Sequence, residues 1–266
     1  MQDKKARRAR KAKAKSERAR RAQIALYVVI AALIIAIIVL GYFVSEHAKK
    51  AKISEEEINL AKSYVAECIK AKLLEEGIPL IAKQGGYYKL PNESINFLDE
   101  STAFYLKDGK LLVPHKRVVE IQIENWINNN TRQCLNLPYE GMKASSFEAR
   151  AYLKEKELQV DIKNLKIMKE KTSSLVNFDF SLALDILRLL NASLRLVNEY
   201  KNETDEMPGY LCIECIDRIA VEEGINLTIV PVTKTLYREE HVWFLLNSSQ
   251  KLNDKYLIWR FVTELR

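Results

Sequence analysis

The hydrophobic pattern of the chain is unusual near its beginning. Residues 24–44 read IALYVVIAALIIAIIVLGYFV and contain no charged or strongly polar side chain. A helix of this length covers ~31 Å, the thickness of the hydrocarbon core of a bilayer. Tyr27, Tyr42 and Phe43 lie near its ends, where aromatic rings prefer the headgroup level. We therefore predict a transmembrane helix at residues 23–45, with residues 24–44 in contact with membrane lipid.

The next part of the chain reads as two amphipathic helices separated by strands. A capping box beginning at Ser54 predicts the start of the first helix, and Gly77-Ile78-Pro79 is expected to end it. Short strands are predicted at residues 87–90 and on both sides of Asp108-Gly109, a dipeptide typical of hairpin turns. The second helix begins at Pro114. Its apolar face contains Val119, Ile123, Trp126 and Ile127, and Cys134 follows on the same face.

Further along the chain the hydrophobic period changes to two. Residues 147–153 and 158–162 alternate apolar and polar side chains, and a shift near Asn164 predicts a bulge or bend. Helices are then predicted at residues 179–200 and 210–223, the second ending at Gly224, and strands at 227–232, 242–246 and 256–262. This mixed order predicts an α+β fold. The predicted segments are a basic tail (1–22), a transmembrane helix (23–45), a helix-hairpin-helix lobe (46–138) and an α+β lobe (139–266), with the lobes divided near Pro138.

Positive charge is concentrated in the tail. Residues 1–22 contain eleven Lys and Arg against two acidic residues, so the tail is +9, whereas the whole chain is +7 and the remainder is −2. Basic residues at one end of a span hold that end in the cytoplasm, which predicts a cell-membrane protein with an extracytoplasmic C-terminal domain. The tail is expected to bind anionic lipid, at ~1 kcal/mol per basic residue near the surface. A nucleic-acid or ribosome-binding arm is the alternative, but the tail has no interleaved aromatic residue to stack on bases.

The apolar segment is expected to remain as a signal-anchor. It is longer than the core of a secretory signal, and residues 45–48 lack a small-x-small cleavage site. A type IV pilin-like signal of archaeal surface proteins would instead be cut between Ala22 and Gln23, leaving the apolar segment on the mature protein. Pilins often have Glu at the fifth mature position, where this chain has Tyr27. A pilin-like filament subunit is therefore an alternative that Tyr27 weakens.

N-glycosylation motifs are strongly enriched after the span. With 16 Asn and 22 Ser and Thr in 266 residues, chance predicts about 1.3 N-x-S/T sequons, whereas six occur. The acceptor positions are Asn92, Asn129, Asn191, Asn202, Asn226 and Asn247. All six lie on the side of the span that the charge pattern places outside the cell. The excess predicts an extracellular glycoprotein.

The four cysteines also lie beyond the span, which suits an oxidising compartment. Cys68 and Cys134 each lie on the apolar face of an amphipathic helix, and the hairpin between these helices should bring them together. We expect the disulfides Cys68–Cys134 and Cys212–Cys215. Two buried free thiols are the alternative for the first pair. The second pair is spaced i, i+3, which is strained inside a regular helix, so its alternative is a reduced pair.

Cys212-Ile213-Glu214-Cys215 also has the C-x-x-C spacing of thiol oxidoreductases, at the start of a predicted helix whose dipole lowers a thiol pKa. No strand leads directly into the motif, as a thioredoxin-like unit requires, and both cysteines share an apolar face with Ile216 and Ile219. A structural role is therefore favoured, and an extracytoplasmic thiol–disulfide oxidoreductase is the alternative function. A zinc site would need two more ligands, and the three histidines form no cluster.

A resemblance supports the same location. Ala22-Gln23 before the span, Val65-Ala66-Glu67-Cys68, Gln84-Gly85-Gly86-Tyr87 and a helix ending at Arg132-Gln133-Cys134 resemble a group of uncharacterised single-pass surface proteins from small-genome archaea. The resemblance covers roughly the first half of the chain. It implies a membrane-anchored, outward-facing protein with two cysteines in its first lobe, and it implies no activity.

Enzyme signatures are absent from the sequence. There is no G-x-S-x-G, P-loop, G-x-G-x-x-G or H-E-x-x-H motif, and we expect no catalytic residues, cofactor or metal. The sequence thus predicts a membrane-anchored surface protein that acts by binding an extracytoplasmic protein or glycan.

Overall fold

The computed structural model describes residues 30–42, 53–97, 100–170, 172–206, 212–234, 239–252 and 255–264. The chain divides into two units, residues 1–52 and residues 53–266. In the first unit the structure describes one helix, at residues 30–42. The predicted basic tail (1–22), the processing site at Ala22 and Gln23, and both ends of the predicted span lie outside the described residues. Among the described residues, no helix has both the length and the apolar character needed to cross a membrane.

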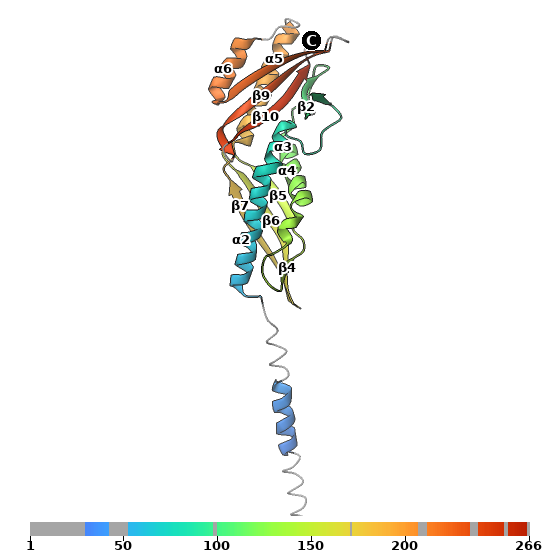
Figure 1. Cartoon of the computed structure of the whole chain (residues 1–266), viewed down its shortest axis with the longest axis vertical. Coiled ribbons are helices and arrows are strands. Elements are labelled where there is room, and N and C mark those ends of the chain that lie inside the picture. The colour runs from blue at the N-terminus through green and yellow to red at the C-terminus, as the bar shows by residue number, and fades with distance from the viewer. Residues whose placement is uncertain are drawn as a thin grey trace, which may run out of the picture. The chain divides into compact units, whose positions relative to one another are not determined.

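The second unit has the predicted α+β fold and contains two sheets (Figure 1). The upper sheet has the strand order β1-β2-β10-β9-β8, with β3 paired to β2, and only β2 and β10 run parallel. Its strands are β1 (Ser94–Phe97), β2 (Glu100–Lys107), β3 (Lys110–Leu111), β8 (Asn226–Lys234), β9 (Glu239–Leu252) and β10 (Lys255–Glu264). In the antiparallel lower sheet, β6 pairs with β4 and β5 on one side and with β7 on the other. These strands are β4 (Met142–Ala144), β5 (Glu148–Leu153), β6 (Leu158–Lys169) and β7 (Thr172–Leu182).

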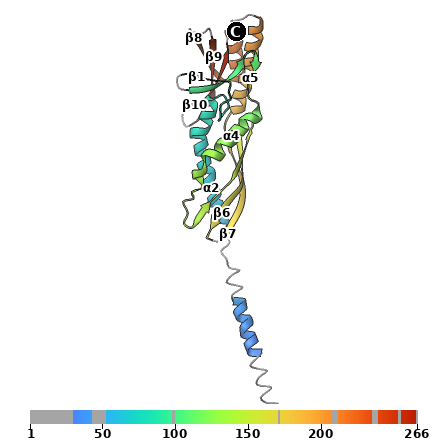
Figure 2. The ribbon, with the colours of Figure 1, turned by 90° about the vertical axis from the view of Figure 1, so that its right-hand side faces the viewer.

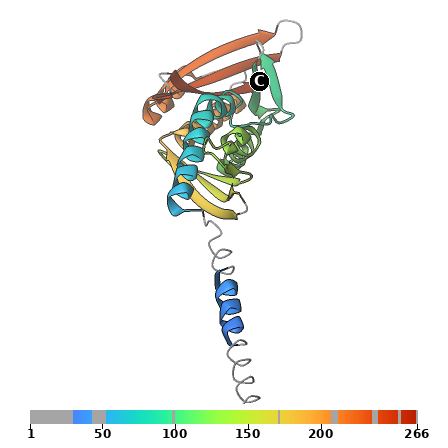
Figure 3. The same ribbon diagram turned by 60° about the horizontal axis from the view of Figure 1, so that its bottom comes forward.

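Helices cover one face of each sheet. On the lower sheet, α2 (Glu55–Lys72) contacts β7 and α4 (Lys116–Asn130) contacts β5, and both lie on the same side (Figure 2). Against the upper sheet, α5 (Ile186–Glu206) contacts β2 and β9, and α6 (Ile213–Glu223) contacts α5 and β8. The short helix α3 (Ile78–Lys83) contacts β10 and so joins the two halves (Figure 3).

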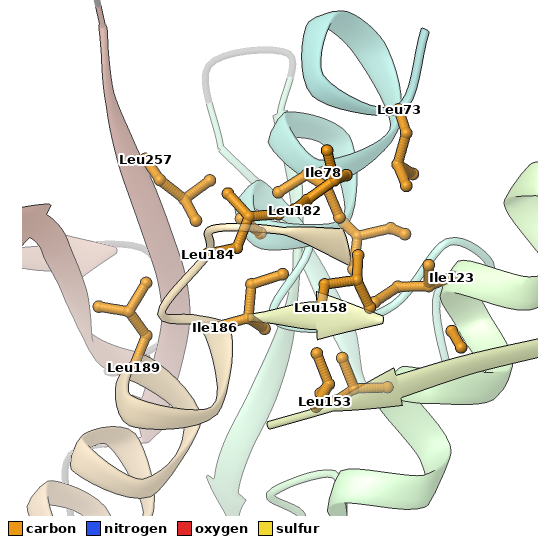
Figure 4. Packing of buried hydrophobic residues seen from close by; sticks show 14 of the residues in the cluster. Leu73, Ile78, Ile123, Leu153, Leu158, Leu182, Leu184, Ile186, Leu189 and Leu257 are labelled. Carbon is orange, nitrogen blue, oxygen red and sulfur yellow. The ribbon is translucent and has the colours of Figure 1, made fainter. Parts of the chain in front are cut away.

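One hydrophobic core runs through residues 53–266. Leu73, Ile78 and Leu182 all belong to this core, and Ile78 lies beside Leu182 (Figure 4). The cluster takes residues from both sides of Pro138, the predicted division between the lobes. A second, small cluster lies on the other face of the upper sheet and contains Phe104, Trp243 and Val262.

The first helix does not end where the sequence predicted. A π-helical turn, Leu73–Gly77, connects α2 directly to α3, so the prediction that Gly77-Ile78-Pro79 ends the helix is wrong. Pro79 lies in the first turn of α3, directly after the π-helical turn. A Cβ atom on Gly77 would lie 2.7 Å from the Trp126 ring, so this glycine permits close packing of two helices.

The predicted strand at residues 87–90 is also wrong. The backbone N–H groups of Tyr88 and Lys89 donate to the Gln122 side-chain oxygen, at 3.1 and 3.0 Å, instead of to a strand. The pairing partner of β2 is β1, which begins at Ser94. This part of the chain is therefore fixed by a side chain of α4, which strand propensity does not reveal.

A third correction concerns residues 172–185. The sequence predicted a helix from Asp179, but β7 continues to Leu182 and pairs with β6 along its length, and α5 begins at Ile186.

Other predictions are confirmed. Asp108 and Gly109 form the hairpin turn with positive φ angles, Asn164 lies at the shift of register in β6, and Gly224 ends α6 in the left-handed conformation.

Candidate functional site

The disulfide Cys68–Cys134 is formed, as the sequence predicted, and joins α2 to the segment after α4. Its Cα atoms are 5.6 Å apart, Cys134 is fully buried, and Cys68 is half-buried against the core. The route to this pairing differs from the prediction, because α4 ends at Asn130 and Cys134 lies in a separate 3₁₀ turn, Arg132–Leu135. The disulfide therefore fixes the end of α2 to the segment that leaves α4.

The disulfide Cys212–Cys215 is also formed, with Cα atoms 5.3 Å apart. Cys212 is the N-cap of α6 and has an extended backbone, so the pair lies across the first turn and not within a regular helix. The Cys215 backbone N–H donates to Cys212 Sγ at 3.1 Å. Both cysteines are half-buried, while Ile216 and Ile219 beyond them are buried. This geometry suits a structural clamp on the helix start and leaves both residues partly exposed.

The six sequon asparagines lie at the surface. Asn92 is in the loop before β1, Asn129 ends α4, Asn191 and Asn202 lie on α5, Asn226 begins β8, and Asn247 is in β9. Five are exposed and Asn247 is half-buried. None lies in α2 or in β7, whereas Asn129 lies on α4, which packs on β5, so glycans at these sites would be absent from α2 and β7 themselves.

The hydroxyl groups of two sequons are buried. Thr131 Oγ1, in the Asn129 sequon, donates to the Ile127 carbonyl at 2.8 Å. Ser193 Oγ, in the Asn191 sequon, donates to the Leu189 carbonyl at 2.7 Å. An enzyme that must contact the sequon hydroxyl cannot reach either group in the folded chain.

The described residues contain few groups suited to catalysis. They contain no group of His, Cys, Asp and Glu side chains that could hold a metal ion. A pocket of about 480 Å³ lies beside the start of α5 and is lined by charged residues, including Asp185, Arg188 and Glu223. These charged groups already have partners. Asp185 accepts from Ser248 Oγ at 2.7 Å and pairs with Arg188, and Glu223 pairs with Arg195.

Buried tyrosines serve the core in the same way. The Tyr105 hydroxyl donates to the Gly85 carbonyl at 3.1 Å and accepts from the Trp259 ring N–H at 3.0 Å. Burial raises the pKa of Tyr105 well above its usual value, so it stays protonated. This network fixes the Gly85-Gly86 turn beside β10, so the turn has a structural role.

Most sheet edges of the second unit are protected against further pairing. On the edge strand β5, the N–H groups of Ala149, Ala151 and Leu153 donate to side chains of α4, at 2.9–3.1 Å. The acceptors are Asn128, Glu124 and Glu120, spaced four residues apart on one helix face. β8 contains Pro231, which has no N–H, and β1 and β4 are only four and three residues long.

The edge of β7 differs from the others. This strand has 11 residues without Lys or Pro, and it pairs with β6 on one side only within the described chain (Figure 1). Leu175 on its outer face is 68% exposed. On its inner face Val176 and Phe178 are only partly buried, whereas the inward residues of β6 beside them are fully buried. An additional strand here would complete the burial of these side chains.

Charge along the outer face is uneven at this edge. Arg150 of β5, Asp161 of β6 and Asp179 of β7 lie directly opposite one another in adjacent strands. The two carboxylates are neighbours of like charge, which is unfavourable, and Asp179 is the outermost of the row. A basic residue on an added strand would balance Asp179.

Comparison with known proteins gives no identification: no family model, curated protein or solved structure matches this chain. The resemblance to archaeal surface proteins stays a prediction.

Proposed function

We propose that the chain is a single-pass membrane protein whose residues 46–266 lie outside the cell, carry N-linked glycans and act by binding another protein. The observation that carries the proposal is the pairing of all four cysteines in disulfides. Disulfides persist in oxidising compartments and are rare in the cytosol. The six surface sequons and the charge pattern favour the same location.

The apolar segment supports an anchor in the membrane. The described helix at residues 30–42 consists of apolar residues, and its large side chains are exposed, Ile37 by 66%. An isolated apolar helix exposes its side chains at a high free-energy cost in water but not in lipid. The basic residues before it favour a cytoplasmic N-terminus, held close to anionic lipid.

Protease accessibility tests this topology. Protease added to intact cells is expected to digest a C-terminal tag and to spare an N-terminal tag, and both tags should be digested after the membrane is permeabilised. Protection of the C-terminal tag in intact cells would contradict the orientation and the glycosylation together. A chain found only in the soluble fraction would contradict the anchor.

The binding surface that we propose is the free edge of β7. Its occupant is an extended segment of a partner protein, which adds to the lower sheet as a further strand. The half-buried Val176 and Phe178 favour apolar residues in that segment, and Asp179 favours a Lys or Arg opposite it. The absence of sequons from this part of the surface keeps the edge accessible.

Site-specific photo-crosslinking on cells tests the β7 edge. A photoreactive phenylalanine at Leu175 is expected to give one discrete product, attached to an extended partner segment that contains a basic residue. The same group at Tyr152, which is exposed on β5 of the same sheet, is the matched control and should give none. Asp179→Lys should abolish the product at Leu175 without loss of stability, because it removes the repulsion with Asp161. No product at Leu175, or an equal product at Tyr152, would refute this surface.

A thiol–disulfide oxidoreductase is the second candidate, because Cys212 and Cys215 lie at a helix N-terminus and are partly accessible. It predicts insulin reduction by the purified protein that disappears in Cys212→Ser. A structural disulfide predicts no such activity, and we favour it because α5, not a strand, is the element before α6 in the described part of the chain. The pilin-like alternative predicts a mature N-terminus at Gln23, which N-terminal sequencing would detect.

A further inference from the structure

Two sequons that are 21 positions apart in the sequence meet in the upper sheet. Asn226 of β8 lies directly opposite Asn247 of β9 in the antiparallel register. Their neighbours Leu227 and Leu246 pack against the main core on the inner face. Because side chains alternate along a strand, Asn226 and Asn247 both project from the outer face.

The space above this pair is limited. Directly opposite residues in antiparallel strands have Cβ atoms only ~4.5–5.5 Å apart. Ile258 of β10 lies opposite Asn247 on its other side and also projects outward, since its neighbours Leu257 and Trp259 belong to the main core. Asn247 is therefore bounded by side chains on both adjacent strands, whereas Asn226 has an adjacent strand on one side only within the described chain.

We propose that Asn226 and Asn247 are competing acceptors and that the folded protein carries one glycan at this pair, on Asn226. The inference rests on the proposed function, since it requires the second unit to be outside the cell. Asn226 is exposed on the edge strand, and Thr228, which completes its sequon, is exposed on the same face. Asn247 is half-buried in an inner strand. Asn247 accepts the glycan only when the Asn226 sequon is removed.

The chemistry defines what excludes the second glycan. The side-chain amide nitrogen of Asn forms a bond to C1 of the first sugar, and the bond from C1 to the diphosphate of a lipid-linked oligosaccharide breaks. The lipid diphosphate leaves and the amide releases one proton. A sugar ring on Asn226 then occupies the volume that a donor must enter to reach Asn247, because the two side chains stand nearly parallel on one face.

The position of this glycan has a consequence for the outer face of the upper sheet. Leu245 and Ile258 are half-buried beside the pair, and Tyr256 further along β10 is 52% exposed. A sugar ring has an apolar face and would cover part of this apolar surface. The glycan would thus shield one sheet face while the β7 edge stays bare.

Intact-mass analysis of the full chain, expressed in cells that perform N-glycosylation, tests the inference. The wild type and Asn247→Gln are expected to carry the same number of glycans. Asn226→Gln should also carry that number, with the glycan shifted to Asn247, and the double variant should lose the mass of one glycan. Thr228→Ala and Ser249→Ala remove the same sequons without changing either Asn and should give the same two results.

Asn92→Gln is the matched control and should leave the occupancy of Asn226 and Asn247 unchanged. Glycans on both Asn226 and Asn247 of the same molecule would overturn the inference. A wild-type chain with a glycan on Asn92 but none on Asn226 or Asn247 would overturn it too. In either case the proposed function would stand. A chain without a glycan at any of the six sequons would instead contradict the extracytoplasmic glycoprotein itself, and the competing pair with it.

Discussion

Gly77 shows that the role of a residue can depend on a partner far away in the sequence. The motif Gly77-Ile78-Pro79 is typical of a helix end, yet Gly77 has helical backbone angles, φ −68° and ψ −57°. Its lack of a side chain matters because the Trp126 ring of α4 fills the adjacent space. The sequence could not reveal this, since the approach of the two helices is a tertiary contact.

This contact predicts the sign of one substitution. Ala normally stabilises a helix by ~0.5–1 kcal/mol relative to Gly. Gly77→Ala should instead lower the free energy of unfolding by ~1–3 kcal/mol, because its Cβ would overlap the Trp126 ring. Urea unfolding measures the change, and the loss should be smaller when Trp126 is replaced by Leu. A stabilised Gly77→Ala variant would contradict the packing.

Tyr200 predicts a dependence on alkaline pH. Its hydroxyl donates to the Glu264 carbonyl at 3.3 Å and joins α5 to β10, and burial raises its pKa to about 12 from the usual 10.0. Between these values the folded chain keeps the proton that the unfolded chain has lost, so stability should fall as pH rises from about 10 to about 12. Urea unfolding across this range should show a shallower fall in Tyr200→Phe. Equal slopes in the two proteins would refute this role.

At the scale of elements, the sequence predicted those features correctly that neighbouring residues alone determine. The Asp108-Gly109 hairpin needs two positive φ angles, and the apolar stripe of α4 is buried as predicted. The failure at β7 is instructive. Residues 178–184 read FDFSLAL, which alternates with the period of a strand, and the Leu-rich helix begins only after Asp185. The two patterns adjoin without a glycine or proline between them, so the sequence does not mark where the strand ends and the helix begins.

The spacing of acceptors on α4 leads to an element-scale prediction. Glu120 is 5% exposed and accepts the Leu153 N–H at 2.9 Å, so it substitutes for a missing neighbour strand of β5. Glu120→Ala leaves that N–H without its acceptor and should destabilise the protein by ~1–3 kcal/mol. Glu120→Gln keeps an oxygen acceptor and should lose clearly less. Denaturant unfolding compares the two variants, and equal losses would show that the N–H bond is unimportant.

For the whole molecule, the sequence predicted the cysteine pairing and the α+β fold class but not the arrangement of the sheets. The pairing followed from two amphipathic helices that a hairpin brings together, and α2 and the turn after α4 do meet. The parallel pairing of β2 with β10 joins residues more than 150 positions apart, and no local pattern indicates it. The candidate β7 edge was missed for the same reason, because an edge exists only once the order of strands is known.

The two disulfides should stabilise the molecule unequally. Cys68 and Cys134 are 66 positions apart, and closing a loop of this size stabilises a fold by ~4 kcal/mol in the chain-entropy model, whereas a separation of 3 gives only ~2 kcal/mol or less. Replacing Cys68 and Cys134 together by Ala should therefore shift the urea midpoint much further than replacing Cys212 and Cys215. Ala avoids placing a hydroxyl at Cys134, which is fully buried.

Peptide mapping without reductant should recover Cys68 linked to Cys134 in the wild type. Alkylatable thiols at both positions, or equal shifts for the two double variants, would contradict the assignment of this disulfide as the main covalent constraint on the fold.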